Sequence, residues 1–149
     1  MKYLNELLST HNNFAALILR IPAGLILMAH GGQKLFAWFG GYGLEGTGQF
    51  MASIGLEPGY LMALLAGSAE FFGGLALVLG LLVRPAAVAL AITMLVAIVS
   101  VHLVNGLFMS NNGYEYGLIL LTISVSLVVS GGGALSLDRA VHKALAQRP

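Results

Sequence analysis

Long apolar segments, separated by short polar or glycine-rich stretches, dominate the pattern of this sequence. Four such segments run from about Phe14 to Leu35, Tyr60 to Leu82, Ala86 to Val104, and Tyr116 to Val129. A helix needs about 17–25 apolar residues to cross a bilayer, and the fourth segment reaches that length only if it extends back through Gly113. The runs are continuous rather than alternating, so they predict helices and not the strands of a membrane barrel. We therefore predict an all-α integral membrane protein, a four-transmembrane-helix bundle in a single domain over residues 1–149.

The segment between the first two predicted spans is rich in glycine and aromatic residues and is too long for a simple turn. Its aromatic residues are typical of a belt at the membrane–water interface: Phe36, Trp38, Phe39 and Tyr42. Residues 46–55 predict a short amphipathic helix on the outer surface, with Phe50, Met51 and Ile54 facing the membrane. We expect this outer loop to cover a polar pocket.

The two ends of the chain carry amphipathic patterns. Residues 135–146 alternate apolar side chains with charged ones, which predicts a helix lying on the inner membrane surface. Residues 2–8 show a similar but shorter pattern, which predicts a second surface helix.

The composition supports a membrane location. Of 149 residues, 58% are hydrophobic and 9% are charged, whereas soluble domains are about 25% charged. The net charge is +1 without a basic run, so the chain does not have the composition of a nucleic-acid-binding protein. The sequence contains no cysteine, which excludes disulfides, iron–sulfur clusters and thiolate metal sites; any redox role would need a bound cofactor or a partner.

The distribution of positive charges predicts the orientation of the helices. Basic residues lie before the first predicted span, between the second and third, and after the fourth: Lys2, Arg84, Arg139, Lys143 and Arg148. The opposite side has Lys34 alone. Cytoplasmic segments carry an excess of Lys and Arg, so we predict that both termini are cytoplasmic. Because Arg20 and Pro22 interrupt the first apolar run, we expect a retained span rather than a cleaved signal peptide.

Several ionisable residues fall within the predicted spans or at their ends. Arg20, His30, Glu70 and His102 lie inside, and each charge there costs at least about 2.5–3.5 kcal/mol. At 1.5 Å per residue, Arg20 lies about 8–10 Å from the inner boundary and Glu70 about 15 Å from the outer one. His30 and His102 share a depth in the outer leaflet. Such residues are candidates for function because a plain membrane anchor does not need them.

Depth divides these residues into two groups. Arg20, Arg84 and Asp138 form a predicted inner charge clasp with a structural role. The outer cluster is predicted to bind a ligand and comprises His30, Lys34, Glu70, His102 and Glu115. Arg20, His30 and Lys34 share an arc of about 80° on the first helix. We expect Lys34 to pair with Glu115, and Glu70 to receive a hydrogen bond from His30 or Arg20.

Several ligands fit the outer cluster. A quinone or similar lipophilic molecule would use Glu70 and His102 for proton exchange, and His30, Lys34 and Glu115 to bind its polar head. His30 and His102 would alternatively ligate haem b, or a divalent metal together with a carboxylate. A purely structural network that fixes the register of the helices is a further alternative.

Many of these residues belong to motifs that closely resemble those of the DoxX family. In chain order they are Arg20-Ile-Pro-Ala-Gly24, His30-Gly-Gly-Gln-Lys34-Leu-Phe36, Ser53-Ile-Gly-Leu-Glu-Pro58, Ala69-Glu70-Phe-Phe-Gly-Gly74-Leu-Ala-Leu, Gly80-Leu-Leu-Val-Arg84, Val101-His102, Gly113-Tyr-Glu115-Tyr116 and Ala134-Leu-Ser-Leu-Asp138. They extend from about residue 20 to 139. Glu57 departs from the family pattern, which more often has proline at that position.

The resemblance implies a four-helix protein of the bacterial inner (plasma) membrane that acts as an oxidoreductase component, linked to quinone and to oxidative stress. It implies a soluble or membrane redox partner besides the lipid bilayer, and leaves homo-oligomer formation open. Two other functions stay open: a non-catalytic scaffold for soluble redox enzymes, and a small-solute transporter.

Overall fold

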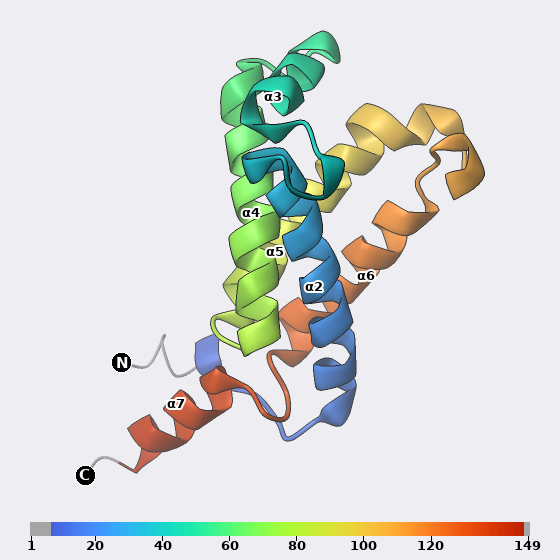
Figure 1. The fold of residues 1–149 in the computed structure, drawn as a ribbon. Coiled ribbons are helices and arrows are strands. Elements are labelled where there is room, and N and C mark those ends of the chain that lie inside the picture. The colour runs from blue at the N-terminus through green and yellow to red at the C-terminus, as the bar shows by residue number, and fades with distance from the viewer. Residues whose placement is uncertain (1–6, 148–149) are drawn as a thin grey trace.

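The computed structural model describes residues 7–147, and these residues form helices and connecting turns without strands (Figure 1). The elements in chain order are α2 Phe14–Phe36, η1 Trp38–Gly40, α3 Gly43–Ser53, α4 Gly59–Leu79, α5 Val83–Ala97, η2 Ile98–His102, η3 Leu103–Asn105, η4 Met109–Asn111, α6 Glu115–Ser130 and α7 Leu137–Ala146. The helix predicted over residues 2–8 lies largely outside the described residues.

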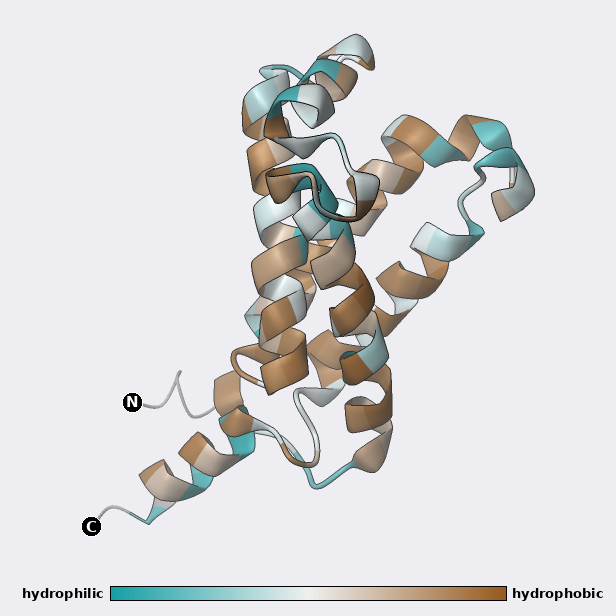
Figure 2. Ribbon diagram, in the orientation of Figure 1, coloured by the Kyte–Doolittle hydropathy of each residue, from teal (hydrophilic) through white to brown (hydrophobic). Residues whose placement is uncertain are grey.

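The long helices α2, α4, α5 and α6 follow one another in alternating directions, with α2 packed mainly on α4 and α5 mainly on α6 (Figure 1). Three helical segments are long and apolar enough to cross a membrane: Phe14–Phe36, Gly59–Leu79 and Val83–Asn105. The fourth helix, α6, has 16 residues and a length of about 24 Å. Hydrophobic residues cover most of these helices, whereas polar residues gather at their ends (Figure 2).

The long helices begin and end at residues that partly differ from the predicted boundaries, and specific contacts explain these ends. The side chain of Asn13 accepts a hydrogen bond from the backbone of Ala15, which caps the start of α2. Gly80 ends α4 with a positive φ of 67°, a conformation that glycine adopts without steric cost. Helix α5 begins at Val83, three residues before the predicted start, because Asp138 caps its first turn from a distant part of the chain.

Glycine residues allow α2 and α4 to approach closely. A Cβ atom added at Gly31 would lie 2.4 Å from the backbone nitrogen of Phe71, and one at Gly24 would lie 2.7 Å from the carbonyl oxygen of Gly74. Close packing of this kind replaces the hydrophobic drive for helix association that is absent in lipid. The backbone contact therefore fixes how far α2 extends along α4.

The outer loop contains the predicted short helix as α3, which packs against the first part of α4. Its buried residues are Thr47 and Gly48, while Phe50 stays exposed. Among the belt aromatics, Trp38 contacts the ring of Phe71 on α4 with a centroid separation of 5.7 Å. The α3 segment thus covers the outer part of α4, beyond the end of α2.

The α2–α4 contact gives a first prediction. Gly31→Ala should destabilise the protein by about 1–3 kcal/mol, because the added methyl group overlaps the backbone of α4. Thermal unfolding in detergent measures the effect as a lower Tm. Val96→Ile, which adds one carbon at an exposed position of α5, should leave the Tm unchanged. An unchanged Tm for Gly31→Ala would show that α2 and α4 can move apart without a loss of stability.

Candidate functional site

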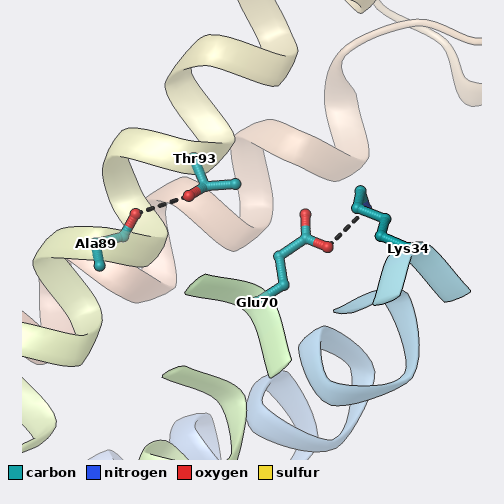
Figure 3. A network of polar contacts seen from close by, with 4 residues as sticks. All are labelled: Lys34, Glu70, Ala89 and Thr93. Carbon is teal, nitrogen blue, oxygen red and sulfur yellow. Dashed lines mark hydrogen bonds and ion pairs between the residues drawn. The ribbon is translucent and has the colours of Figure 1, made fainter. Parts of the chain in front are cut away.

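A buried ion pair joins α2 to α4. Lys34 Nζ lies 2.6 Å from Glu70 Oε2, and the two side chains point toward each other across the helix interface (Figure 3). The Glu70 side chain is 4% exposed and that of Lys34 is 25% exposed, so the carboxylate is enclosed and the ammonium group keeps one open side. In the part of the chain that the structure describes, this is the one salt bridge.

The pairing corrects two predictions from the sequence. Lys34 was expected at the outer surface and paired with Glu115, but it lies level with Glu70, eleven residues into α4 after Gly59. The cause is the α2–α4 packing: α2 ends near the middle of α4, and α3 takes the outer part of α4 instead. The donor predicted for Glu70 was His30 or Arg20, and the donor in the structure is Lys34.

His30 and Tyr116 complete the surroundings of the pair. The two rings have centroids 6.0 Å apart, with His30 on α2 and Tyr116 at the start of α6. Lys34 interacts electrostatically with His30, and Glu70 with Tyr116. The cluster Lys34–Glu70–His30–Tyr116 therefore combines side chains from three helices.

Tyr116 was missed as a site residue in the sequence, although it belongs to the motif that was singled out at residues 113–116. Glu115 drew attention because it is charged. Successive helical residues point about 100° apart, so of the two neighbours only Tyr116 faces α2. The site residues were selected by the cost of burying a charge, and a tyrosine is not selected in this way because its hydroxyl is neutral.

The other two predicted members of the outer cluster hold the loop between α5 and α6. Glu115 Oε1 accepts a hydrogen bond from the backbone nitrogen of Met109 at 2.6 Å. His102 Nδ1 lies 2.9 Å from the carbonyl oxygen of Asn112, and His102 ends the π-helical segment η2. Within residues 7–147, no three His, Asp or Glu side chains gather closely enough to hold a metal ion.

At the end of the bundle where α2 begins and α6 ends, Arg20 binds backbone oxygens from two parts of the chain. Its guanidinium donates to the carbonyls at the end of α4, Leu77 and Val78, and to those of the segment before α7: Gly132, Ala134 and Leu135. The side chain is 1% exposed. The planar fork of donors suits arginine for this role, because its five N–H groups are spread over three nitrogen atoms, whereas the three donors of lysine share one nitrogen.

Asp138 and Arg84 act in the same region. Asp138 accepts hydrogen bonds from the backbone nitrogens of Leu82 and Val83 at 2.7 and 2.9 Å. Arg84 donates to the carbonyl oxygens of Val128 and Ser9, each at 3.0 Å. The three charges predicted as a clasp gather at the inner end, but each binds backbone groups instead of pairing with another side chain.

Two surface grooves lie away from the ion pair. One has a volume of about 310 Å³ between α3 and α4, where Glu45, Gln49 and Tyr60 are among its lining residues. The other has a volume of about 190 Å³ and is apolar, lined in part by Met28, Trp38 and Phe71. Neither is lined by Lys34 or Glu70, so the predicted polar pocket does not coincide with these grooves.

Comparison with known proteins places the motifs in a family. The model of the DoxX family matches residues 15–103, which include Arg20, His30, Lys34, Glu70 and His102. The chain belongs to the DoxX family. "Putative oxidoreductase CatD" of Bacillus subtilis (strain 168) is 39% identical to this DoxX protein over 127 residues, covering 85% of the chain and 87% of CatD.

Two relatives in Escherichia coli (strain K12) are named inner membrane proteins. YqjF is 33% identical over 85% of this DoxX chain and 92% of its own length, and YphA is 32% identical over 83% and 87%. No solved structure matches this chain significantly. Family membership and the apolar helices together identify a membrane protein.

The ion pair of this DoxX protein generates a second prediction. Glu70→Gln or Lys34→Met alone should cost about 3–5 kcal/mol, because each leaves a buried charge without its partner. The double variant should recover most of that loss. Unfolding in detergent of the wild type, both single variants and the double variant gives the coupling energy. Additive losses would mean that the two side chains do not interact.

Proposed function

We propose that this chain is a redox-associated subunit of the bacterial inner membrane that binds a quinone, or a similar lipophilic ligand with a polar head, beside Lys34 and Glu70. Helix α6 is the fourth span, and both ends of the chain lie in the cytoplasm. The naming of CatD as an oxidoreductase supports the redox part of the proposal. Electrons would come from a bound cofactor or from a partner, since the chain has no cysteine.

The observation that carries the proposal is the ion pair itself. A buried pair is costly to form, and replacing such a pair by apolar residues is often neutral or stabilising. The register of α2 and α4 is already fixed by the contacts of Gly24 and Gly31, so the pair is not needed to align the helices. We infer that Lys34 and Glu70 serve chemistry at this depth, as intramembrane ionisable residues commonly do.

The neighbouring groups match the needs of a quinone head. Its carbonyl oxygens are hydrogen-bond acceptors, and the ammonium of Lys34 and the hydroxyl of Tyr116 are donors. Glu70 and His30 are able to hold the protons that accompany quinone reduction. The exposed side of Lys34 is where the ligand would approach. His102 and Glu115 would determine the shape of the loop between α5 and α6, given the contacts that each makes there.

A binding titration tests the ligand proposal. Purified protein in detergent should bind a short-chain quinone, and the double variant Lys34→Met/Glu70→Gln should bind at least about tenfold more weakly, since a lost charged hydrogen bond is worth about 1.5–3 kcal/mol. Thr93→Val is the control, because the Thr93 hydroxyl bonds to Ala89 within α5 (Figure 3). Equal binding by wild type and double variant, or no binding by either, would contradict the proposal.

A scaffold that holds soluble redox enzymes at the membrane is the second candidate. The satisfied Lys34–Glu70 pair favours it, because each charge already has a partner and needs no ligand. A scaffold would still retain its partner enzymes in the double variant. It would lose them when the inner surface around Arg84 and residues 138–143 is altered. Partner retention and quinone binding, measured on the same variants, separate the two functions.

The proposed topology has its own test. The chain lacks cysteine, so single cysteines at Gln49, Ser110 and Gln147 report the side of the membrane without background labelling. In intact spheroplasts, a membrane-impermeant maleimide should label Gln49→Cys and Ser110→Cys. It should label Gln147→Cys only after permeabilisation. Labelling of both Ser110→Cys and Gln147→Cys from outside would mean that α6 does not cross the membrane, and labelling of Gln147→Cys alone would mean that the orientation is reversed.

A further inference from the structure

Helix α7 is held firmly at its start and makes few contacts beyond it. Ser136 caps the helix by accepting from the backbone of Arg139, and the backbone nitrogen of Asp138 donates to the carbonyl of Gly80 at 2.9 Å. Arg139 also bonds to Asn12. Beyond this first turn, α7 extends outward from the end of the bundle and does not pack along it (Figure 1).

Helix α7 has two distinct faces. Leu137 and Val141 are 44% and 39% exposed, and helical spacing puts them on one side of the helix. Arg139 and Lys143 lie on the opposite side. The single acidic residue of the helix, Asp138, is buried and caps α5, so its charge is not presented at the surface. The exposed surface of α7 therefore combines an apolar face with a cationic one.

The position of α7 places these faces where the apolar helices end. Thr10, just before α2, bonds to the carbonyl of Ser130 at the end of α6, and Ala134 bonds to Asn13. Helix α7 starts three residues later, at Leu137. In Figure 2 the mostly brown ribbon of the bundle is followed by alternating brown and teal along α7. A bilayer around the bundle would have its headgroups at this level.

From these observations we propose that α7 is a docking helix for anionic lipid. Leu137 and Val141 would enter the headgroup–acyl boundary, and Arg139 and Lys143 would bind the negatively charged headgroups of the same leaflet. An amphipathic helix with Lys and Arg on its polar face binds membranes in this way, through apolar burial and attraction to anionic lipid. The inference depends on the membrane location of the bundle and is independent of any ligand at Lys34.

Docking would be transmitted to the bundle through the first turn of α7. Asp138 binds the start of α5, and the preceding residues Ala134 and Leu135 bind Arg20 of α2. These contacts connect α7 to the junction between α4 and α5. An anionic bilayer should therefore stabilise the inner end of the bundle as well as α7.

A fluorescence experiment on the full chain tests the proposal. Val141→Cys, on the apolar face of α7, carries an environment-sensitive fluorophore. The protein is reconstituted in vesicles of phosphatidylcholine alone or with one third phosphatidylglycerol, each containing nitroxide-labelled lipid as quencher. We expect strong quenching at position 141 with phosphatidylglycerol and weaker quenching without it.

Charge dependence completes the test. High salt should reduce quenching at position 141 in the unaltered helix, and Lys143→Gln should lower the ratio of docked to undocked label about fivefold, as expected for one cation near an anionic surface. Lys143→Gln should keep the helical content and the wild-type Tm in phosphatidylcholine. Equal quenching at position 141 in both lipids would overturn the proposal. Energy transfer between labels on two copies, without quenching by lipid, would show that α7 pairs with a second chain instead.

Discussion

The close approach of α2 and α4 is the constraint on which the rest of the structure depends. Glycine at positions 24, 31 and 74 removes the side chains that would separate the two backbones, and the contact sets the level at which α2 ends along α4. Lys34 reaches Glu70 because of that level, and Trp38 reaches Phe71 for the same reason. The outer half of α4 is then free to pack with α3.

The two ends of the bundle use charge in different ways. At the end where α2 begins and α6 ends, Arg20 and Asp138 satisfy backbone groups that helix termini leave without partners, so their charges are spread over several hydrogen bonds. Arginine fits this role because its donors point in several directions at once. In the outer half, Lys34 and Glu70 neutralise each other, and one side of the ammonium stays open. Unlike Arg20 and Asp138, which are buried, Lys34 keeps a charged group that another molecule can reach.

The chain belongs to the DoxX family; its relatives YqjF and YphA are named inner membrane proteins, and CatD is named a putative oxidoreductase. The cluster of Lys34, Glu70, His30 and Tyr116 is where a lipophilic redox ligand would find both hydrogen-bond donors and proton carriers. Helix α7 is a separate feature with its own expected partner, the lipid surface.

The sequence alone determined the helical class, the approximate extent of the long helices and the set of costly charges, because each depends on local hydrophobicity and on the price of burying a charge. It did not determine which charges meet. Lys34 was predicted to pair with Glu115 on the assumption that all spans end at one level. Glycine packing instead ends α2 near the middle of α4, where Lys34 meets Glu70. Tyr116 joined the cluster, and Asp138 capped α5, through contacts between distant segments. Such contacts are decided by the way the helices pack, which no local pattern contains.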